Sequence, residues 1–314
     1  MVVGVTGGTG FLGEALVLRH LQEGHKVRVL SRRPSGSLML LGKVEIFQGD
    51  LTGPPATLVP FVEGVDVLYH CAGEIGDWAR MESVNVLGTR NLCTAAHSKI
   101  GHWVQLSSVG VYGPHSRCVV TEETPLNPVR LYEKTKAESD AEVIRAAGEG
   151  AFSFSILRPS NTFGPTMRNR SLFQLIAMID RGFFFFIGRP GALANYIYVA
   201  NVAEALVLCG RLTAARGHVY NLSDYCTIEE FVSVIADELG KPLPKLRLSE
   251  GPVRWIAKLG GKLRGFPLTE TRVDALTNRS SYPIDRIRKE LGYTHLVSME
   301  DGLRQMVRVL KQCL

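Results

Sequence analysis

The sequence contains no apolar run of the roughly 20 residues that a helix needs to span a bilayer. Its six cysteines form no CxxC pair, and no His/Cys cluster has the spacing of a metal site, so we predict no bound metal. No basic segment separates Met1 from the first apolar residues, which argues against a secretory signal. Sparse cysteines in a long chain indicate a reducing compartment, and we expect a cytoplasmic protein.

The basic residues form no dense block either. The formal net charge is +6 and the sequence pI is about 9.0, which suits an anionic small ligand. Because lysines and arginines are scattered along the chain, we expect no binding to nucleic acid. Hydrophobic residues make up 45% and charged residues 21%, which is typical of a globular protein with a large core.

Short apolar, β-rich runs alternate with helical patterns in the first half of the chain. This alternation predicts a doubly wound parallel sheet, the Rossmann type of α/β fold, with helices on both faces. The expected strands are residues 2–5, 26–30, 44–48, 65–71, 102–106 and 152–157, and the expected helices are 11–22, 82–97 and 132–147.

A glycine-rich loop follows the first expected strand. Gly7, Gly10 and Gly13 form a GxxGxxG pattern that opens the helix at 11–22. A Cβ there would obstruct the tight turn and the approach of backbone N–H groups to a pyrophosphate, while the helix amino terminus adds positive charge. The pattern predicts a dinucleotide site formed by Gly7, Thr9, Gly10, Phe11, Leu12 and Gly13.

The regular alternation of expected strands and helices ends after Pro159. Helical patterns at 171–181 and 227–239 are separated by turn-rich stretches. We therefore assign residues 1–165 to a dinucleotide-binding domain, to which 191–222 return, and residues 166–314 mainly to a smaller, interleaved substrate-binding region.

The second expected strand ends without an acidic residue. An acid about 20 positions beyond the glycines would bind the ribose hydroxyls of NAD. Arg32, 19 residues after Gly13, stands there instead, and a guanidinium pairs with the 2′-phosphate of NADP. The sequence favours NADP over NAD, and the alternative is that Arg32 is a solvated surface group.

Several further motifs resemble, in order and spacing, the extended short-chain dehydrogenase/reductase family, and the resemblance covers nearly the whole chain. They are Asp50-Leu51, His70-Cys71-Ala72-Gly73, Asn85-Val86-Leu87-Gly88-Thr89, Ser107-Ser108-Val109-Gly110-Val111-Tyr112-Gly113, Tyr132-Glu133-Lys134-Thr135-Lys136, Leu157-Arg158-Pro159-Ser160-Asn161-Thr162-Phe163-Gly164-Pro165, Tyr198-Val199-Ala200-Asn201-Val202-Ala203 and Leu291-Gly292-Tyr293.

The resemblance implies a set of cofactor contacts. Asp50 and Leu51 would contact the adenine, and Pro159 would lie near the nicotinamide. Asn85 would help to order the active site, and His70 would have a packing role or lie beside the cofactor rather than act as a base. The ribose and phosphates would be lined by Cys71, Ala72 and Gly73.

Tyr132 and Lys136 are four residues apart at the start of an expected helix, so their side chains share one face. An ammonium beside a phenol favours the phenolate and lowers the pKa of the tyrosine. Tyr132 would then exchange a proton with the substrate oxygen during hydride transfer, and Lys136 would also bind the nicotinamide ribose, as in the family. Ser108 would hydrogen-bond the same oxygen, with Ser107 as the alternative.

The substrate is less strongly indicated. The stretch around Asn161 resembles family members that act on nucleotide-linked sugars, in which the matching Asn contacts the diphosphate, and we favour this substrate class. The runner-up is a hydroxysteroid- or dihydroflavonol-type dehydrogenase with a hydrophobic substrate. The four phenylalanines 183–186 would line a pocket for such a substrate, although a buried strand is favoured.

Both a reductase and an epimerase working through a transient ketone are compatible with the same catalytic group. Arg32 favours a dissociable NADP reductase. A cofactor-binding regulatory protein without turnover is a third hypothesis, disfavoured because Tyr132 and Lys136 are both present. Family members often dimerise, which implies a homodimer.

The stretch 252–266 has the pattern of a basic amphipathic helix, with Arg254, Lys258 and Lys262 four residues apart and Trp255 between them. Peripheral contact with an anionic membrane is one interpretation. A surface helix with a solvated basic face is the favoured one.

Overall fold

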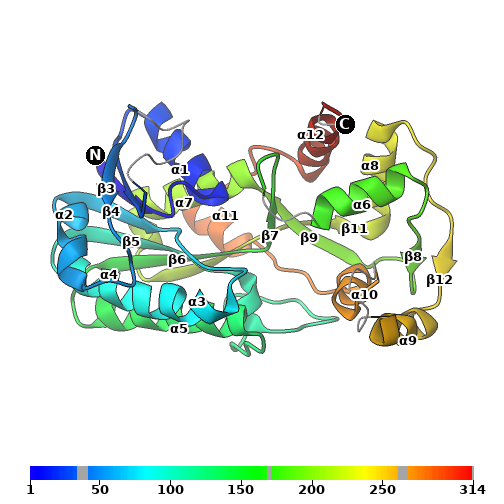
Figure 1. Ribbon diagram of the computed structural model, residues 1–314, viewed down its shortest axis with the longest axis horizontal. Helices are drawn as coiled ribbons and strands as arrows, with labels where there is room; N and C mark the ends of the chain where they lie inside the picture. Colours follow the sequence, from blue (N-terminus) through cyan, green and yellow to red (C-terminus); the bar gives the residue numbers. More distant parts are fainter. Residues whose placement is uncertain (34–41, 168–170, 261–267, 313–314) are drawn as a thin grey trace.

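A parallel sheet forms the centre of the larger of two lobes in the computed structural model, which describes residues 1–33, 42–167, 171–260 and 268–312 (Figure 1). Every neighbouring pair of its seven strands is parallel. The predicted doubly wound sheet is confirmed. Its strands, in spatial order, are β10 (His218–Leu222), β6 (Ser153–Pro159), β5 (Ile100–Leu106), β4 (Val65–His70), β1 (Val2–Thr6), β2 (Lys26–Ser31) and β3 (Glu45–Gln48).

Apolar side chains on both faces of this sheet explain its sandwich of helices, since a parallel sheet must be covered twice. One face packs on α1 (Phe11–Gln22), α7 (Val199–Arg211) and α11 (Asp285–Leu291). The other packs on α2 (Val59–Val62), α4 (Gly88–Ala96) and α5 (Leu131–Gly148). Shorter helical turns are Pro55–Leu58, α3 (Trp78–Glu82), Ser83–Leu87, Val109–Tyr112 and Thr213–Ala215.

The second lobe has a core of its own, built from apolar residues of its helices and sheets. One sheet comprises β11 (Asp224–Thr227), β9 (Leu193–Tyr198) and β7 (Asn161–Phe163), and the other pairs β12 (Arg247–Leu248) with β8 (Phe186–Ile187). After β9 the chain passes through α7 into β10 at the edge of the main sheet. The helices of this lobe are α6 (Ser171–Asp180), α8 (Ile228–Leu239), α9 (Glu250–Gly260), α10 (Glu270–Thr277) and α12 (Met299–Gln312).

Two local expectations differ from the structure. The helix expected over 82–97 is interrupted by a π-helical turn at Ser83–Leu87, before α4 begins. Such turns occur frequently at functional sites, because the extra residue reorients a side chain. The phenylalanine run is not one buried strand: Phe186 lies in β8, whereas Phe183 is 71% exposed.

Candidate active site

The glycine loop fits closely against its neighbours. Gly7 has a φ of +68°, and a Cβ there would lie 2.7 Å from the backbone nitrogen of Ala72. A Cβ on Gly13 would lie 2.1 Å from the Gly7 carbonyl oxygen. Only glycine permits this packing. The amino terminus of α1 lies at the C-terminal edge of the sheet, and no side chain from Gly7 or Gly13 covers it. This is the cradle that a dinucleotide pyrophosphate requires.

Arg32 and Asp50 lie side by side at the ends of neighbouring strands, and both are exposed. Asp50 Oδ1 accepts hydrogen bonds from the backbone N–H and the hydroxyl of Thr52, both at 2.9 Å. The hydrogen bond from the Thr52 backbone lowers the pKa of Asp50, and the charge of Arg32 contributes further. Leu51 is buried beside it. The structure thus brings together an exposed cation, a carboxylate and an apolar side chain beyond β2 and β3.

His70, the last residue of β4, is held between two threonines. The Thr89 hydroxyl donates to the Asn85 carbonyl, so its oxygen accepts from His70 Nε2 at 3.0 Å. His70 Nδ1 is then the acceptor for the Thr6 hydroxyl at 2.7 Å. Burial lowers the pKa of His70 to about 3, so the ring is neutral. Both ring nitrogens are committed to the framework, as expected for a packing role.

Asn85 lies in the π-helical turn and is buried. Its Oδ1 accepts from the Glu74 backbone N–H at 2.7 Å, and its Nδ2 donates to the Glu74 carbonyl and to the Thr135 hydroxyl, both at 3.1 Å. The side chain therefore joins the loop after β4, which carries Cys71, Ala72 and Gly73, to the start of α5.

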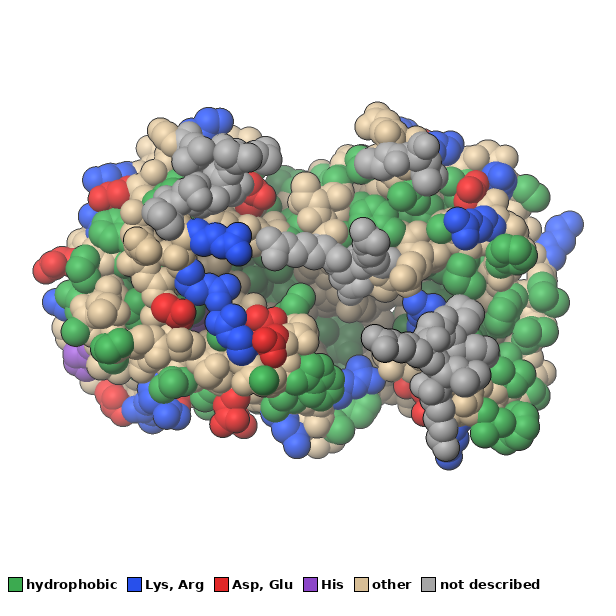
Figure 2. All heavy atoms as spheres, viewed as in Figure 1, with side chains coloured by type: hydrophobic (Ala, Val, Ile, Leu, Met, Phe, Trp, Pro, Cys, Tyr) green, Lys and Arg blue, Asp and Glu red, His purple; other side chains and the backbone are tan. Residues whose placement is uncertain are grey.

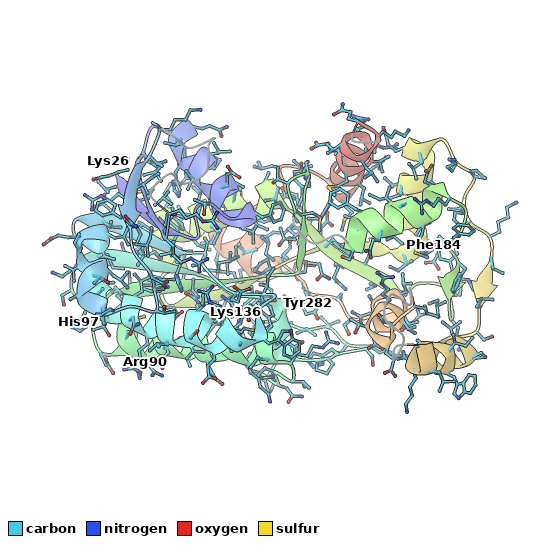
Figure 3. The ribbon with its side chains drawn as sticks, viewed as in Figure 1. Lys26, Arg90, His97, Lys136, Phe184 and Tyr282 are labelled. Carbon is cyan, nitrogen blue, oxygen red and sulfur yellow. The ribbon has the colours of Figure 1, made fainter. Side chains whose placement is uncertain are left out.

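The Ser108 side chain lies near the Tyr132 hydroxyl and acts to lower the pKa of the phenol. Ser108 also caps the short helix after β5, accepting from the Gly110 N–H at 3.1 Å. Lys136 follows one turn later on α5, is buried, and donates from Nζ to the Leu106 carbonyl. The structure thus brings Ser108, Tyr132 and Lys136 together beyond the C-terminal ends of β5 and β6, and Figure 3 shows Lys136 within the larger lobe, near α5.

The pKa of Tyr132 moves opposite to the sequence-based expectation. Burial raises the pKa of the phenol, the Ser108 side chain opposes this, and the charge of Asp140 raises it further. Burial lowers the pKa of Lys136, which Asp140 opposes. In this environment, desolvation outweighs the expected effect of the ammonium, because the phenolate would lose its water.

Sequence reasoning missed a buried network behind this group. Asp140 Oδ2 accepts from the Ser107 hydroxyl at 2.7 Å and from Arg158 Nη2 at 3.2 Å. Arg158 Nη1 also donates to the Tyr112 hydroxyl at 3.1 Å. Asp140 lies four residues after Lys136, and Arg158 is the one charged residue of strand β6. The positions of Asp140 and Arg158 were the available sequence signal for this buried ion pair, since a charged residue in a buried strand requires a partner.

The remaining predicted positions border the second lobe. Pro159 is buried at the end of β6, next to Arg158. Asn161 is exposed at the start of β7, and its Nδ2 donates to the Asn195 carbonyl at 3.3 Å. Phe11 lies against Gly164, where a Cβ would be 3.3 Å from its ring. Figure 2 shows the surface hollowed between the two lobes, with hydrophobic side chains along part of the hollow.

Comparison with known proteins decides the family. Residues 3–223 match the model of the NAD dependent epimerase/dehydratase family, which covers the glycine loop, the Ser108–Tyr132–Lys136 group and β10. The chain belongs to this family. Family membership, with relatives named as dehydrogenases and reductases, makes the chain an NAD(P)-dependent enzyme of the short-chain dehydrogenase/reductase type.

Two curated members of the family align over nearly the whole chain. A 3 beta-hydroxysteroid dehydrogenase/Delta 5-->4-isomerase of Mycobacterium tuberculosis is 29% identical, with 96% of this chain and 88% of that protein covered. A 2-alkyl-3-oxoalkanoate reductase of Stenotrophomonas maltophilia is 28% identical, with 98% of both chains covered.

A solved family structure shares the fold. UDP-glucuronic acid 4-epimerase from Bacillus cereus, in complex with NAD, superposes with a TM-score of 0.78 at 21% identity, covering 100% of this chain and 99% of that one. This likeness establishes the arrangement of the two lobes and leaves the substrate open.

Proposed function

We propose that the enzyme interconverts a ketone and a secondary alcohol by hydride transfer, with Ser108, Tyr132 and Lys136 as its catalytic residues. The observation that carries the proposal is the placement of the three side chains: Ser108 follows β5, Tyr132 lies near it, and Lys136, one helical turn along α5, bonds to the Leu106 carbonyl at the end of β5. Ser107 is committed to Asp140, which supports Ser108 as the substrate-binding hydroxyl. When bound, the nicotinamide supplies or accepts the hydride.

The raised pKa of Tyr132 keeps its hydroxyl protonated at neutral pH, which is the form that a ketone reduction needs. In that direction, Tyr132 donates its proton to the carbonyl oxygen, and Ser108 hydrogen-bonds the same oxygen and holds it in place. Lys136 is buried beside this group, and its protonated form stabilises negative charge on the tyrosine oxygen after the proton has left. In alcohol oxidation, the same groups act in reverse.

For the substrate, we propose an apolar ketone or alcohol of the hydroxysteroid or alkyl-oxoacid kind. The relatives that support this align over at least 96% of the chain at 28–29% identity. The nucleotide-linked sugar favoured by the sequence motifs is the second candidate. The exposed amide of Asn161 at the start of β7 supports it, because such an amide can donate to a diphosphate oxygen.

We propose NADP as the preferred cofactor. Arg32 is exposed at the end of β2, where a guanidinium can meet a 2′-phosphate. The charge of Arg32 contributes to the lowered pKa of Asp50, which supports a position of the guanidinium near the strand ends. A homodimer is proposed from the family resemblance.

The test is a substrate panel assayed with NADPH and NADH. We expect NADPH consumption with a 3-ketosteroid or a 2-alkyl-3-oxoacid and none with UDP-sugars. Interconversion of UDP-sugar epimers, with tightly held NAD and no net cofactor consumption, would replace the apolar proposal with the sugar epimerase. Cofactor binding without turnover on any member of a broad ketone panel would favour the regulatory alternative.

A further inference from the structure

Helix α9 (Glu250–Gly260) presents an apolar outer face. Its inner face packs on the second lobe through Val253 and Ala257. On the outside, Trp255 is 65% exposed, and Ile256 and Leu259 are 45% and 51% exposed. The described part of this helix therefore presents exposed apolar side chains beside the exposed Lys258 of the expected basic face. Residues 261–266 of the expected helix, including Lys262, lie outside the described residues.

The adjoining strand β12 extends this apolar surface. Leu246 is 59% exposed and Leu248 is 37% exposed, on either side of the strand residue Arg247. Figure 1 places β12 and α9 at the same end of the second lobe, and Figure 2 shows hydrophobic side chains gathered there. We call Leu246, Leu248, Trp255, Ile256 and Leu259 the α9 surface.

Unpaired positive charge borders the α9 surface. Lys245 and Lys258 are both exposed, and neither forms an ion pair within the described ranges of the chain. Of the acidic groups nearby, Glu250 and Asp274 both pair with Arg254, at 2.9 and 2.6 Å, whereas Glu270 on the neighbouring helix α10 is exposed. The exposed positive charge directly beside the apolar side chains comes from Lys245 and Lys258.

We propose that the α9 surface docks on an anionic lipid bilayer. An exposed Trp, Ile and Leu beside lysines matches the boundary between acyl chains and negatively charged headgroups. A second copy of the chain fits less well, since a two-fold contact through this surface would bring like charges of Lys245 and Lys258 together. Among the helices of the described residues, none has the length and hydropathy of a membrane span.

The experiment is flotation of the full chain with vesicles of phosphatidylcholine, or of phosphatidylcholine with 30% phosphatidylglycerol, as roughly physiological anionic content. No cofactor or substrate is added, so the result is independent of the proposed reaction. We expect binding to the anionic vesicles only, decreasing as salt is raised. Trp255→Ala should weaken it about tenfold, because an interfacial aromatic anchor is lost.

Matched controls lie on the other lobe. Trp78 is 70% exposed, and Trp78→Ala should leave vesicle binding unchanged. Lys258→Glu should weaken binding to anionic vesicles, whereas Lys99→Glu, also at an exposed lysine, should not. All four changes are at surface positions, and unchanged melting temperatures would show that the variants fold.

Three results would overturn the proposal. Equal binding to neutral and anionic vesicles is the first, and equal losses for Trp78→Ala and Trp255→Ala are the second. The third is a dimer, measured by light scattering without lipid, that Trp255→Ala dissociates, since the α9 surface would then belong to a second copy.

Discussion

The Asp140 carboxylate lies 3.2 Å from the Arg158 guanidinium, and the two side chains are only 1% and 5% exposed. Through Ser107 the same carboxylate reaches the end of β5, and through α5 it is one turn from Lys136. A buried ion pair of this kind positions the ends of β5, β6 and α5 relative to one another. We regard Asp140 as a positioning residue for the proposed catalytic residues Ser108, Tyr132 and Lys136.

Asp140→Asn should change the pH dependence of catalysis. The Asp140 charge raises the pKa of both Tyr132 and Lys136, so its removal lowers both. The basic limb of the kcat/KM profile should therefore move to lower pH. Stability should fall by about 3–5 kcal/mol, since Arg158 is left buried without its counter-charge.

A double variant separates the two effects of Asp140. Adding Arg158→Gln should restore part of the melting temperature, because the uncompensated charge is gone, while the pH profile stays shifted. A lower melting temperature with an unmoved pH profile in Asp140→Asn would show a purely structural role.

Tyr132→Phe should remove the proton donor and lower kcat by about 10²–10⁴-fold. Cofactor affinity, measured by fluorescence titration, should stay within about twofold of the wild type, since the ring is kept. Tyr225→Phe, at a half-exposed tyrosine of β11, is the control and should keep full activity. Turnover that survives in Tyr132→Phe contradicts the assignment of this residue.

Arg32→Ala should weaken NADPH binding by about 1.5–3 kcal/mol, the range for loss of a hydrogen bond to a charged group. NADH binding should change little, since NADH has no 2′-phosphate. Arg33→Ala, at the adjacent exposed arginine, is the matched control. Equal losses for both cofactors would refute the assignment of Arg32.

Stability should fall on acidification from neutral pH because of buried neutral histidines. Burial lowers the pKa of His20 and His70 to about 3 and that of His102 to about 4, below the usual 6.5. At a pH between the lowered pKa of the folded chain and the usual 6.5, each of these histidines binds a proton only when the chain is unfolded. Its stabilisation is complete above pH 6.5 and is lost at about 1.4 kcal/mol per pH unit below it.

Chemical denaturation between pH 7 and pH 5 measures this slope. His102→Gln should reduce this slope, because it removes one of the histidine protons that bind only in the unfolded chain, while His20, His70 and His295 still contribute. A slope that does not change in the variant would show that His102 titrates normally in the folded protein.

The sequence predicted the parallel sheet because periodicity and glycine placement are local signals. Gly7 and Gly13 show this, because a Cβ at either position would clash with the backbone, and the glycine pattern of the loop itself indicates that constraint. Local signals did not extend to the network behind the catalytic group. The pairing of Asp140 with Arg158 depends on how α5 packs against β6, and the exposure of Trp255 depends on which face of α9 the second lobe covers.

The pKa of Tyr132 illustrates the same limit. From the spacing of Tyr132 and Lys136, an ammonium one turn away predicts a lowered value. Burial, which the sequence does not state, raises it instead. The π-helical turn that carries Asn85 was also missed, since the amide reaches Thr135 only in the folded chain.

The most direct test of the account follows a deuterium from NADPH labelled at nicotinamide C4 into the product, by mass spectrometry, over the ketone panel. We predict deuterium on the new carbinol carbon of an apolar ketone with the wild-type chain, and its loss with Tyr132→Phe. Label that never leaves the bound cofactor for any ketone, or that transfers equally well without the Tyr132 hydroxyl, would contradict the account.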